Sequence, residues 1–181
     1  VIEKGEVHLA YVLEHPEKHF RIIHRAQQKY IFKSGDKEGS PPEHVIEARA
    51  LGKKYHTPAR TMCKVKGDLN RIQILIEEKP IRFTGDLANG ASIVEVGLGG
   101  RSADPTGNWL VEQSSGEHKG YIFKNETQGT YMFLSDVSKG SPPDNIIQAG
   151  GRMTDERHVF YFLEDSETLA DVPSSEVREN N

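Results

Sequence analysis

A segment of nineteen residues occurs twice in this chain, with nine positions identical. Residues 30–48 read YIFKSGDKEGSPPEHVIEA, and residues 131–149 read YMFLSDVSKGSPPDNIIQA. Both copies carry aromatic residues at the first and third positions, a central Gly-Ser-Pro-Pro, an acidic residue behind the prolines and a β-branched pair near the end. The copies begin 101 residues apart in a chain of 181 residues, so half of that separation is the place to look for another copy.

A third, weaker copy begins at residue 81. Residues 81–97 read IRFTGDLANGASIVEVG, and Phe83 follows Phe32 by 51 residues. The β-branched pair before Glu95 aligns with the pairs of the other copies, although this copy lacks the two prolines. A period near 50 residues indicates an architecture built from repeated units.

The residues between the copies repeat as well. Each copy is preceded and followed by a short run rich in β-branched and aromatic residues, which is typical of strands. Clusters of Gly, Pro, Asn, Asp and Ser separate these runs and supply turns. The runs are residues 19–24, 71–77 and 120–125 before the copies, and 61–67, 108–113 and 158–164 after them.

Long patterns with the period of an amphipathic helix are missing from the sequence. Residues 43–54, EHVIEARALGKK, would pass for a helix if taken alone. The corresponding segments of the other copies carry glycine and β-branched residues, so the repeat predicts a strand here.

Three repeats of about 50 residues, with four short strands in each, describe the chain. Single units of this size cannot bury their apolar faces, whereas closing the strands on one another buries these faces and removes the sheet edges. Twelve strands in this order resemble the β-trefoil, in which six strands form a short barrel and six form hairpins that cap it. The resemblance covers residues 18–165 and implies an all-β fold with pseudo-threefold symmetry. A β-sandwich with duplicated hairpins is the alternative.

The repeat also predicts the domain organisation. We expect a single β-trefoil domain over residues 1–165, followed by a polar, acidic, frayed tail. An N-terminal strand candidate is either an extra edge strand before the first repeat or the true first strand, with residues 15–29 as an excursion. The predicted parts are residues 1–17 with Val7–Leu13 as the extra strand, about 18–67, 68–115 and 116–165 as the repeats, and 166–181 as the tail.

Charge and cysteine content narrow the function classes. A net charge of −4 and a pI near 6.1 argue against nucleic-acid binding, which requires a basic face. The single cysteine, Cys63, excludes an internal disulfide and is expected to be buried and inert. No apolar run approaches the roughly 18 residues of a membrane span, and no secretory signal is visible. We expect a cytoplasmic or non-classically secreted protein without nucleic-acid or membrane partners.

Motifs for catalysis or metal binding are also missing. None of the eight histidines belongs to an HExxH or a Cys/His zinc pattern, and no serine has a GxSxG context. Residues 97–107, GLGGRSADPTG, lack the Walker lysine and do not open a helix, so they do not cradle a phosphate. We therefore expect no enzyme, metal or cofactor, and a binding function carried by loops.

The repeated aromatic residues are expected to pack in the core, because residues two apart in a strand face the same side. They are Tyr30, Phe32, Phe83, Tyr131 and Phe133. The only tryptophan, Trp109, opens a strand of the second repeat. It is expected in the barrel, with a sugar platform as the other interpretation.

Peptidase inhibition is the function that the stiff repeated loops favour. Two prolines fix the backbone of each Gly-Ser-Pro-Pro loop, and a preorganised loop binds at low entropic cost. A basic residue there, Lys37 or Lys139, suits the acidic S1 pocket of a trypsin-like enzyme, while residues 97–107 suit the cleft of a cysteine peptidase. The candidates are Lys37, Ser40, Pro41, Pro42, Arg101, Lys139, Ser141, Pro142 and Pro143. A rigid turn kept by duplication is the structural alternative.

The chain resembles, in general features only, the disulfide-free fungal trefoil peptidase inhibitors. It also resembles ricin-B-like lectins, but lacks their QxW motif at the repeat ends. Carbohydrate binding is therefore the alternative function, with Asp86, Asn89 and Trp109 as candidate residues. A cytokine-like or scaffold module is a second alternative. The expected partner is a peptidase or a glycan, and the oligomeric state is not predicted.

Overall fold

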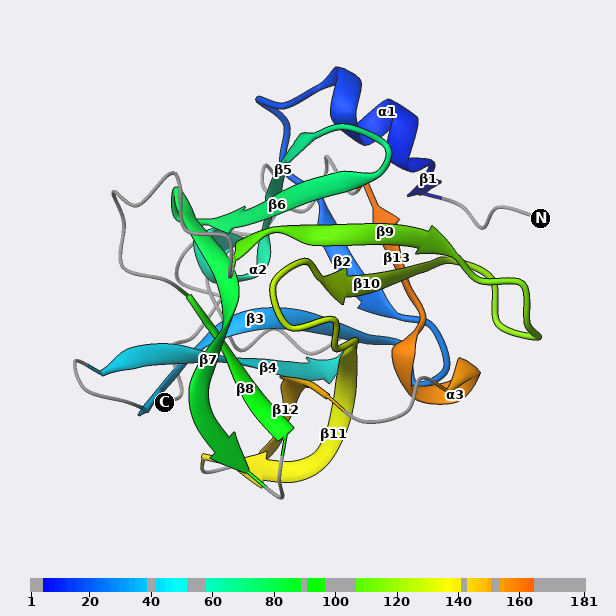
Figure 1. Cartoon of the computed structure of the whole chain (residues 1–181). Coiled ribbons are helices and arrows are strands. Elements are labelled where there is room, and N and C mark those ends of the chain that lie inside the picture. Colours follow the sequence, from blue (N-terminus) through cyan, green and yellow to red (C-terminus); the bar gives the residue numbers. More distant parts are fainter. Residues whose placement is uncertain are drawn as a thin grey trace.

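The computed structural model describes residues 5–38, 42–51, 58–88, 91–96, 107–140, 143–150 and 154–164 (Figure 1). Within these residues there are thirteen strands and three short helices, so the all-β prediction is confirmed in its main feature. The repeat predicts twelve strands, and a further two-residue strand, β1, lies near the N-terminus.

The elements follow one another in three similar series. The strands are β1 (Glu6–Val7), β2 (Arg21–His24), β3 (Lys29–Glu38), β4 (Glu43–Ala50), β5 (Lys64–Gly67), β6 (Arg71–Ile76), β7 (Lys79–Ala88), β8 (Ala91–Val96), β9 (Trp109–Gln113), β10 (Tyr121–Asn125), β11 (Met132–Lys139), β12 (Asp144–Ala149) and β13 (Phe160–Leu163). The helices are α1 (Leu9–Glu14), α2 (Pro58–Thr61) and α3 (Asp155–His158).

The sheet closes on itself. A path of paired strands runs from β13 through β10, β9, β6, β7, β8, β12, β4 and β3 to β2, and β2 pairs with β13 again. Strands β1, β5 and β11 are attached to this path. Backbone hydrogen bonds of 2.8 and 2.7 Å between Phe20 and Cys63 also join the entry of β2 to that of β5. Cys63 is fully buried, as the sequence predicts.

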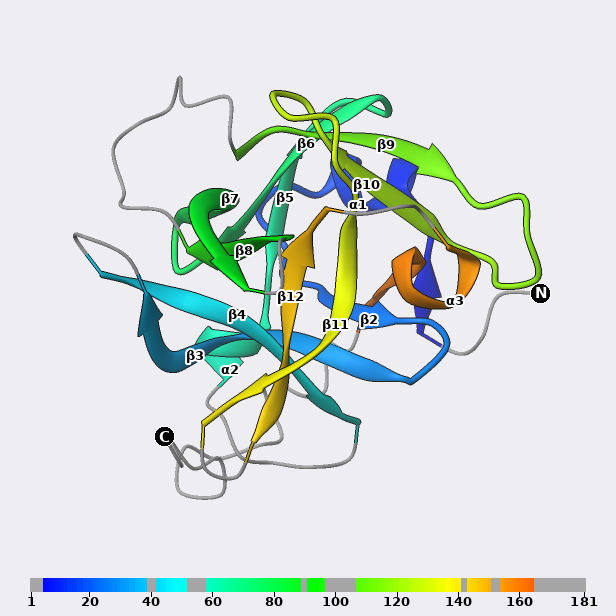
Figure 2. The same ribbon diagram turned by 60° about the horizontal axis from the view of Figure 1, so that its bottom comes forward.

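The repeated segments are three antiparallel hairpins, β3–β4, β7–β8 and β11–β12. Their second strands pair with one another, β4 with β8, β8 with β12 and β12 with β4 (Figure 2). Each hairpin contains a bulge in its first strand. The nineteen-residue segment is therefore the unit from which one end of the molecule is built.

A hydroxyl side chain lies at each bulge and compensates for the lost ladder bonds. Ser34 donates to the carbonyl of Val45 at 2.8 Å, and Thr84 donates to the carbonyl of Ile93 at 3.1 Å. In the third hairpin, Ser135 accepts a bond of 2.9 Å from the backbone N–H two residues further on. Since a buried backbone group must find a partner, this explains why a small hydroxyl residue stands at this register position of all three hairpins.

The acidic residue behind the prolines joins neighbouring hairpins. Glu43, at the tip of β3–β4, pairs with Arg82 at the base of β7–β8 over 2.8 Å. Asp144, at the tip of β11–β12, pairs with Arg49 at the base of β3–β4 through two nitrogens. Glu43 and Arg49 are 5% and 4% exposed, so each pair has one buried partner and one that is partly exposed.

The middle hairpin makes the equivalent junction without a charge. Its copy of the segment lacks the prolines and the acid. The Gln148 side-chain amide of β12 donates instead to the carbonyls of Ala88 and Ala91, at 2.7 and 3.1 Å. Three junctions of the same kind thus connect the three hairpins.

The N-terminal segment differs from its prediction. Val7–Leu13 is expected to be a strand, but only Glu6–Val7 pairs with β13, and Leu9–Glu14 forms α1. Leu9 and Val12 are three residues apart and face the core together, which a helix allows and a strand does not. Helix α1 covers the end of the closed sheet opposite the hairpins (Figure 1).

The core contains the expected aromatic residues of the first repeat and the tryptophan, but not those of the third. Tyr30 and Phe32 are 3% and 0% exposed. Trp109 is also completely buried, and its indole N–H donates to the carbonyl of Ile81 at 3.1 Å. It is a core residue, so its interpretation as a sugar platform is wrong.

Replacing Arg49 by Met is expected to destabilise the fold by about 3 kcal/mol or more, because Asp144, which is only partly exposed, then loses its cation. The free energy of unfolding in urea measures this effect. Arg157→Met is the control, since its 2.6 Å pair with Asp136 is exposed and is expected to contribute no more than about 1 kcal/mol. Equal losses in the two variants would contradict the structural role of the Arg49 pair.

Candidate functional site

The predicted inhibitory residues lie at two hairpin tips and in one loop. Ser40, Pro41, Ser141, Pro142 and Arg101 are outside the residues that the structure describes. Lys37, Pro42 and Pro143 are exposed, as an inhibitory loop requires. Lys139 instead forms an ion pair with Glu38, which ties the β11–β12 tip to the β3–β4 hairpin.

The predicted sugar-binding residues do not form a site in the described part of the chain. Asn89 and the side chain of Asp86 lie outside that part. Trp109, the third candidate, is enclosed in the core. A binding surface must therefore be sought elsewhere.

Two aromatic side chains of the third repeat are partly exposed to solvent. Tyr131 and Phe133, at the start of β11, are both partly exposed, while their counterparts Tyr30 and Phe32 are buried. In the first repeat the rings pack with a separate apolar group, formed by Ile23, Leu51, Tyr161 and Leu163. This difference between two copies of one segment marks the start of β11 as the place where the repeats diverge.

A buried histidine supports the two exposed rings. The His158 ring stacks on Phe133 with centroids 5.2 Å apart and meets Tyr131 edge-on at 6.3 Å. The Thr154 N–H at the start of α3 donates to Nδ1 of His158 at 3.0 Å, and Nε2 has no partner in hydrogen-bonding geometry. Burial lowers the pKa of His158, which the carbonyls of Thr154 and Gly150 oppose and the charge of Arg157 reinforces. A neutral imidazole therefore backs the pair.

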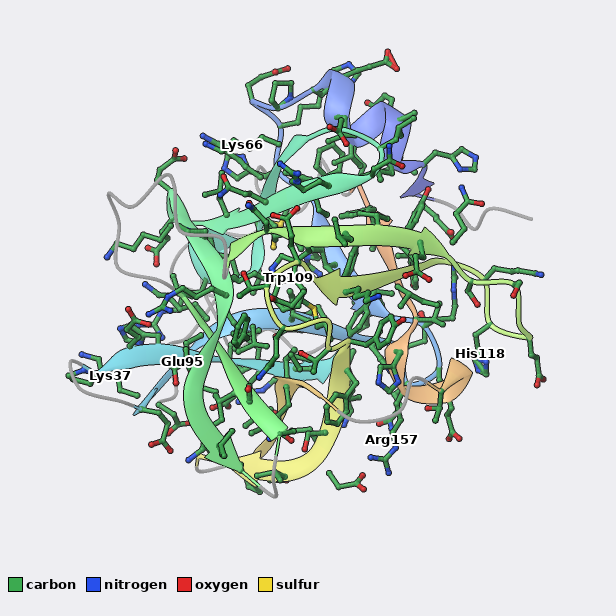
Figure 3. All side chains as sticks on the ribbon, in the orientation of Figure 1. Lys37, Lys66, Glu95, Trp109, His118 and Arg157 are labelled. Carbon is green, nitrogen blue, oxygen red and sulfur yellow. The ribbon has the colours of Figure 1, made fainter. Side chains whose placement is uncertain are left out.

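Polar side chains surround these rings. The ammonium of Lys124 lies 5.7 Å from the centroid of the Tyr131 ring. Arg157 and Asp136 form their exposed pair nearby, and Figure 3 shows Arg157 at the surface beside α3. Gln128, in the turn that leads to Tyr131, is also exposed, and its amide oxygen accepts from the hydroxyls of Ser92 and Thr130 at 3.4 and 2.9 Å. We call this surface the β11 face; it consists of Lys124, Gln128, Tyr131, Phe133, Asp136 and Arg157, with His158 beneath.

The β11 face suits binding rather than catalysis. Aromatic rings offer flat apolar area, and the charged and amide groups around them donate and accept hydrogen bonds. Its single carboxylate, Asp136, is engaged by Arg157, so no second carboxylate completes an acid–base pair. No group of three or more His, Cys, Asp or Glu side chains suited to a metal occurs among the described residues.

Sequence reasoning missed the β11 face because it placed Tyr131 and Phe133 in the core. A comparison of the repeats, position by position, offers one sequence signal for the exposed ring of Tyr131. Lys124 occupies the place of Ile23, 101 residues earlier, where an apolar side chain covers the ring of Tyr30. A lysine at this place indicates an uncovered ring.

A second polar group, at the hairpin junctions, is structural. Glu47 of β4 is 1% exposed, as are Glu95 and Gln148 at the corresponding positions of β8 and β12. Burial, followed by a hydrogen bond with the carboxyl of Asp36, raises the pKa of Glu47 to about 9, with a smaller opposite effect of Ser34. Glu47 is therefore protonated and uncharged at neutral pH.

The chain was also compared with known proteins. No protein-family model matches the sequence, and no curated protein matches it either. Within the described residues, no helix has the length and apolar character to cross a membrane.

Solved structures share the fold at low sequence identity. The ricin B-like lectin of Macrolepiota procera in complex with lactose matches 82% of this chain and 96% of its own, with a TM-score of 0.58 and 12% identity. The designed threefold-symmetric protein ThreeFoil matches over 81% and 99%, with a TM-score of 0.58 and 9% identity. The SDF2-like protein of Arabidopsis thaliana matches over 81% and 92%, with a TM-score of 0.64 and 8% identity. The chain thus has a β-trefoil-like fold.

Glu47→Gln is expected to gain stability relative to the parent protein as the pH rises from 5 to 8. The unfolded chain releases the Glu47 proton near pH 4.5, while the folded chain holds it to about pH 9. Between these values the folded state binds one more proton, so its stability falls with pH by at most about 1.4 kcal/mol per unit.

Urea unfolding at several pH values measures this difference. Glu112→Gln, which removes a carboxylate exposed on β9, controls for the change in net charge. Parallel stability curves for Glu47→Gln and the parent protein would show that Glu47 is ionised in the folded state.

Proposed function

We propose that this protein binds carbohydrate without catalysis, through the β11 face. The observation that carries the proposal is the exposure of Tyr131 and Phe133 while their counterparts in the first repeat are buried. Exposed rings held by a strand and a buried histidine lose little conformational freedom when a ligand packs on them.

The chemistry of the face suits a sugar. The C–H side of a sugar ring is apolar and packs on aromatic rings, and its hydroxyl groups both donate and accept hydrogen bonds. Gln128, Arg157 and Asp136 supply both kinds of partner. A single shallow site covers only part of a ligand, so we expect a dissociation constant on the order of 1 mM, near −4 kcal/mol.

The fold supports this proposal only as an analogy. One structural neighbour is described as a ricin B-like lectin in complex with lactose. We also propose the finer form of the fold, a β-trefoil of three four-stranded repeats to which β1 is added.

Peptidase inhibition, which the stiff loops favour, receives no support from the comparisons. The ion pair of Lys139 with Glu38 makes this lysine unsuited to an S1 pocket. Lys37 and Pro42 remain exposed, so inhibition through the β3–β4 tip stays a prediction.

Tyr131→Ala is expected to weaken glycan binding at least about tenfold, since it removes a ring that packs on the ligand. The measurement is a glycan array with labelled protein, followed by ligand-observed NMR titration of the glycans that bind. Leu87→Ala is the matched control, because Leu87 is 64% exposed at the tip of β7–β8. This variant should bind glycans with the affinity of the parent protein.

Two results would contradict the proposal. Equal binding by Tyr131→Ala and the parent protein would move the site away from the β11 face. Failure to bind any glycan, together with stoichiometric inhibition of trypsin, chymotrypsin or a papain-like peptidase, would replace carbohydrate binding with peptidase inhibition.

A further inference from the structure

One backbone position carries opposite chemistry in two repeats. Lys124 lies opposite Tyr131 in an antiparallel bridge, and Ile23 lies opposite Tyr30 in the first repeat. Ile23 is fully buried and belongs to the apolar cluster around Tyr30, although the Arg21 guanidinium also lies 5.6 Å from that ring. Lys124 is half-buried and presents an ammonium group beside its tyrosine.

The lysine is held in place by its surroundings. Its backbone pairs with Leu110 of β9 on one side and with Tyr131 on the other. The turn residue Gly129 passes close to the lysine stem, since a Cβ atom there would lie 3.8 Å from Cε of Lys124. The backbone pairing and the turn thus place the ammonium beside the ring of Tyr131, 5.7 Å from its centroid.

No carboxylate neutralises Lys124 among the residues that the structure describes. Glu126, two residues away, pairs with Arg71 at 2.8 Å, and Asp136 pairs with Arg157 at 2.6 Å. The contact with the Tyr131 ring contributes about 0.5–1 kcal/mol at such a site. A charge-assisted hydrogen bond with an anionic oxygen is stronger, so the ammonium can still gain from an anion.

The charge of the β11 face is opposite to that of the whole chain. The face combines the cations of Lys124 and Arg157 with the carboxylate of Asp136 and the neutral ring of His158. The chain as a whole has a net charge of −4. An anionic ligand is thus attracted to this face and repelled by much of the remaining surface.

We infer that the ligand of the β11 face is an acidic glycan, which carries a carboxylate or a sulfate group. Lys124 binds the anionic group, while Tyr131 and Phe133 pack against the adjoining sugar ring. This inference rests on the proposed carbohydrate binding and adds the class of sugar. Carboxylate and sulfate share the anionic oxygens that an ammonium recognises.

The test is an array of matched oligosaccharides in neutral, uronic-acid-containing and sulfated forms, probed with the parent protein and three variants. Lys124→Gln removes the charge at similar length, and Lys124→Arg keeps it. Lys37→Gln removes one positive charge from the side of the molecule away from Arg157 (Figure 3). A thermal melt of each variant confirms that it is folded.

The parent protein should bind one or both acidic forms at least fivefold more strongly than the neutral form, and 0.5 M salt should reduce this preference. Lys124→Gln should lower the affinity for acidic forms about tenfold, whereas Lys124→Arg and Lys37→Gln should retain it. Comparison of the uronic-acid-containing and sulfated forms on the array shows whether the protein prefers carboxylate or sulfate.

Binding without preference for the acidic forms would overturn this inference and leave carbohydrate binding intact. A preference that survives in Lys124→Gln would likewise overturn the role of Lys124. Failure of every glycan to bind would instead overturn the proposed function itself.

Discussion

Each hairpin is held by a buried contact between its tip and the base of the next hairpin. A buried charge costs several kcal/mol unless a partner and hydrogen bonds compensate for it, so Glu43 needs Arg82, and Arg49 needs Asp144. This explains why an acid follows the prolines in both long copies of the segment. It also explains how the middle copy could lose prolines and acid together, because the Gln148 amide serves the shorter tip. The position of β11, and with it the exposed rings, depends on these junctions.

The repeated segment buries its aromatic pair in the first repeat and leaves the same pair partly exposed in the third. In the first repeat, Ile23 and residues distant in sequence cover the aromatic pair, which adds apolar burial to the fold. In the third repeat, Lys124 stands at the position of Ile23, and the rings of Tyr131 and Phe133 pack against His158. A duplicated unit therefore needs few changes to turn a closed apolar cluster into an open, charged one, since the backbone that carries both is the same.

Much of the fold could be predicted from the sequence, because the period of the copies reports the strand order directly. The hairpins, the strand over residues 43–50 and the buried Trp109 all follow from aligning one repeat with another. Helix α1 could not be found in this way, since it belongs to no repeat and its form depends on fitting Leu9 and Val12 to the core. The β11 face was hidden for a related reason. Whether the ring of Tyr131 is covered depends on side chains that meet only after folding, and strand periodicity contains no information about them.

Strand β13 joins the N-terminal and C-terminal parts of the sheet, because it pairs with β1 and β2 from the N-terminal region and with β10. In chain order, twelve of the thirteen described strands precede it. Until it pairs, the wall of the molecule has a gap, with the edges of β2 and β10 unpaired and no Phe160 or Phe162 to fill the space beside Phe123. Unpaired edges and uncovered apolar surface are what make nascent chains prone to aggregate. Pairing of β13 with β2 and β10 is thus the step that closes the described sheet and covers these edges.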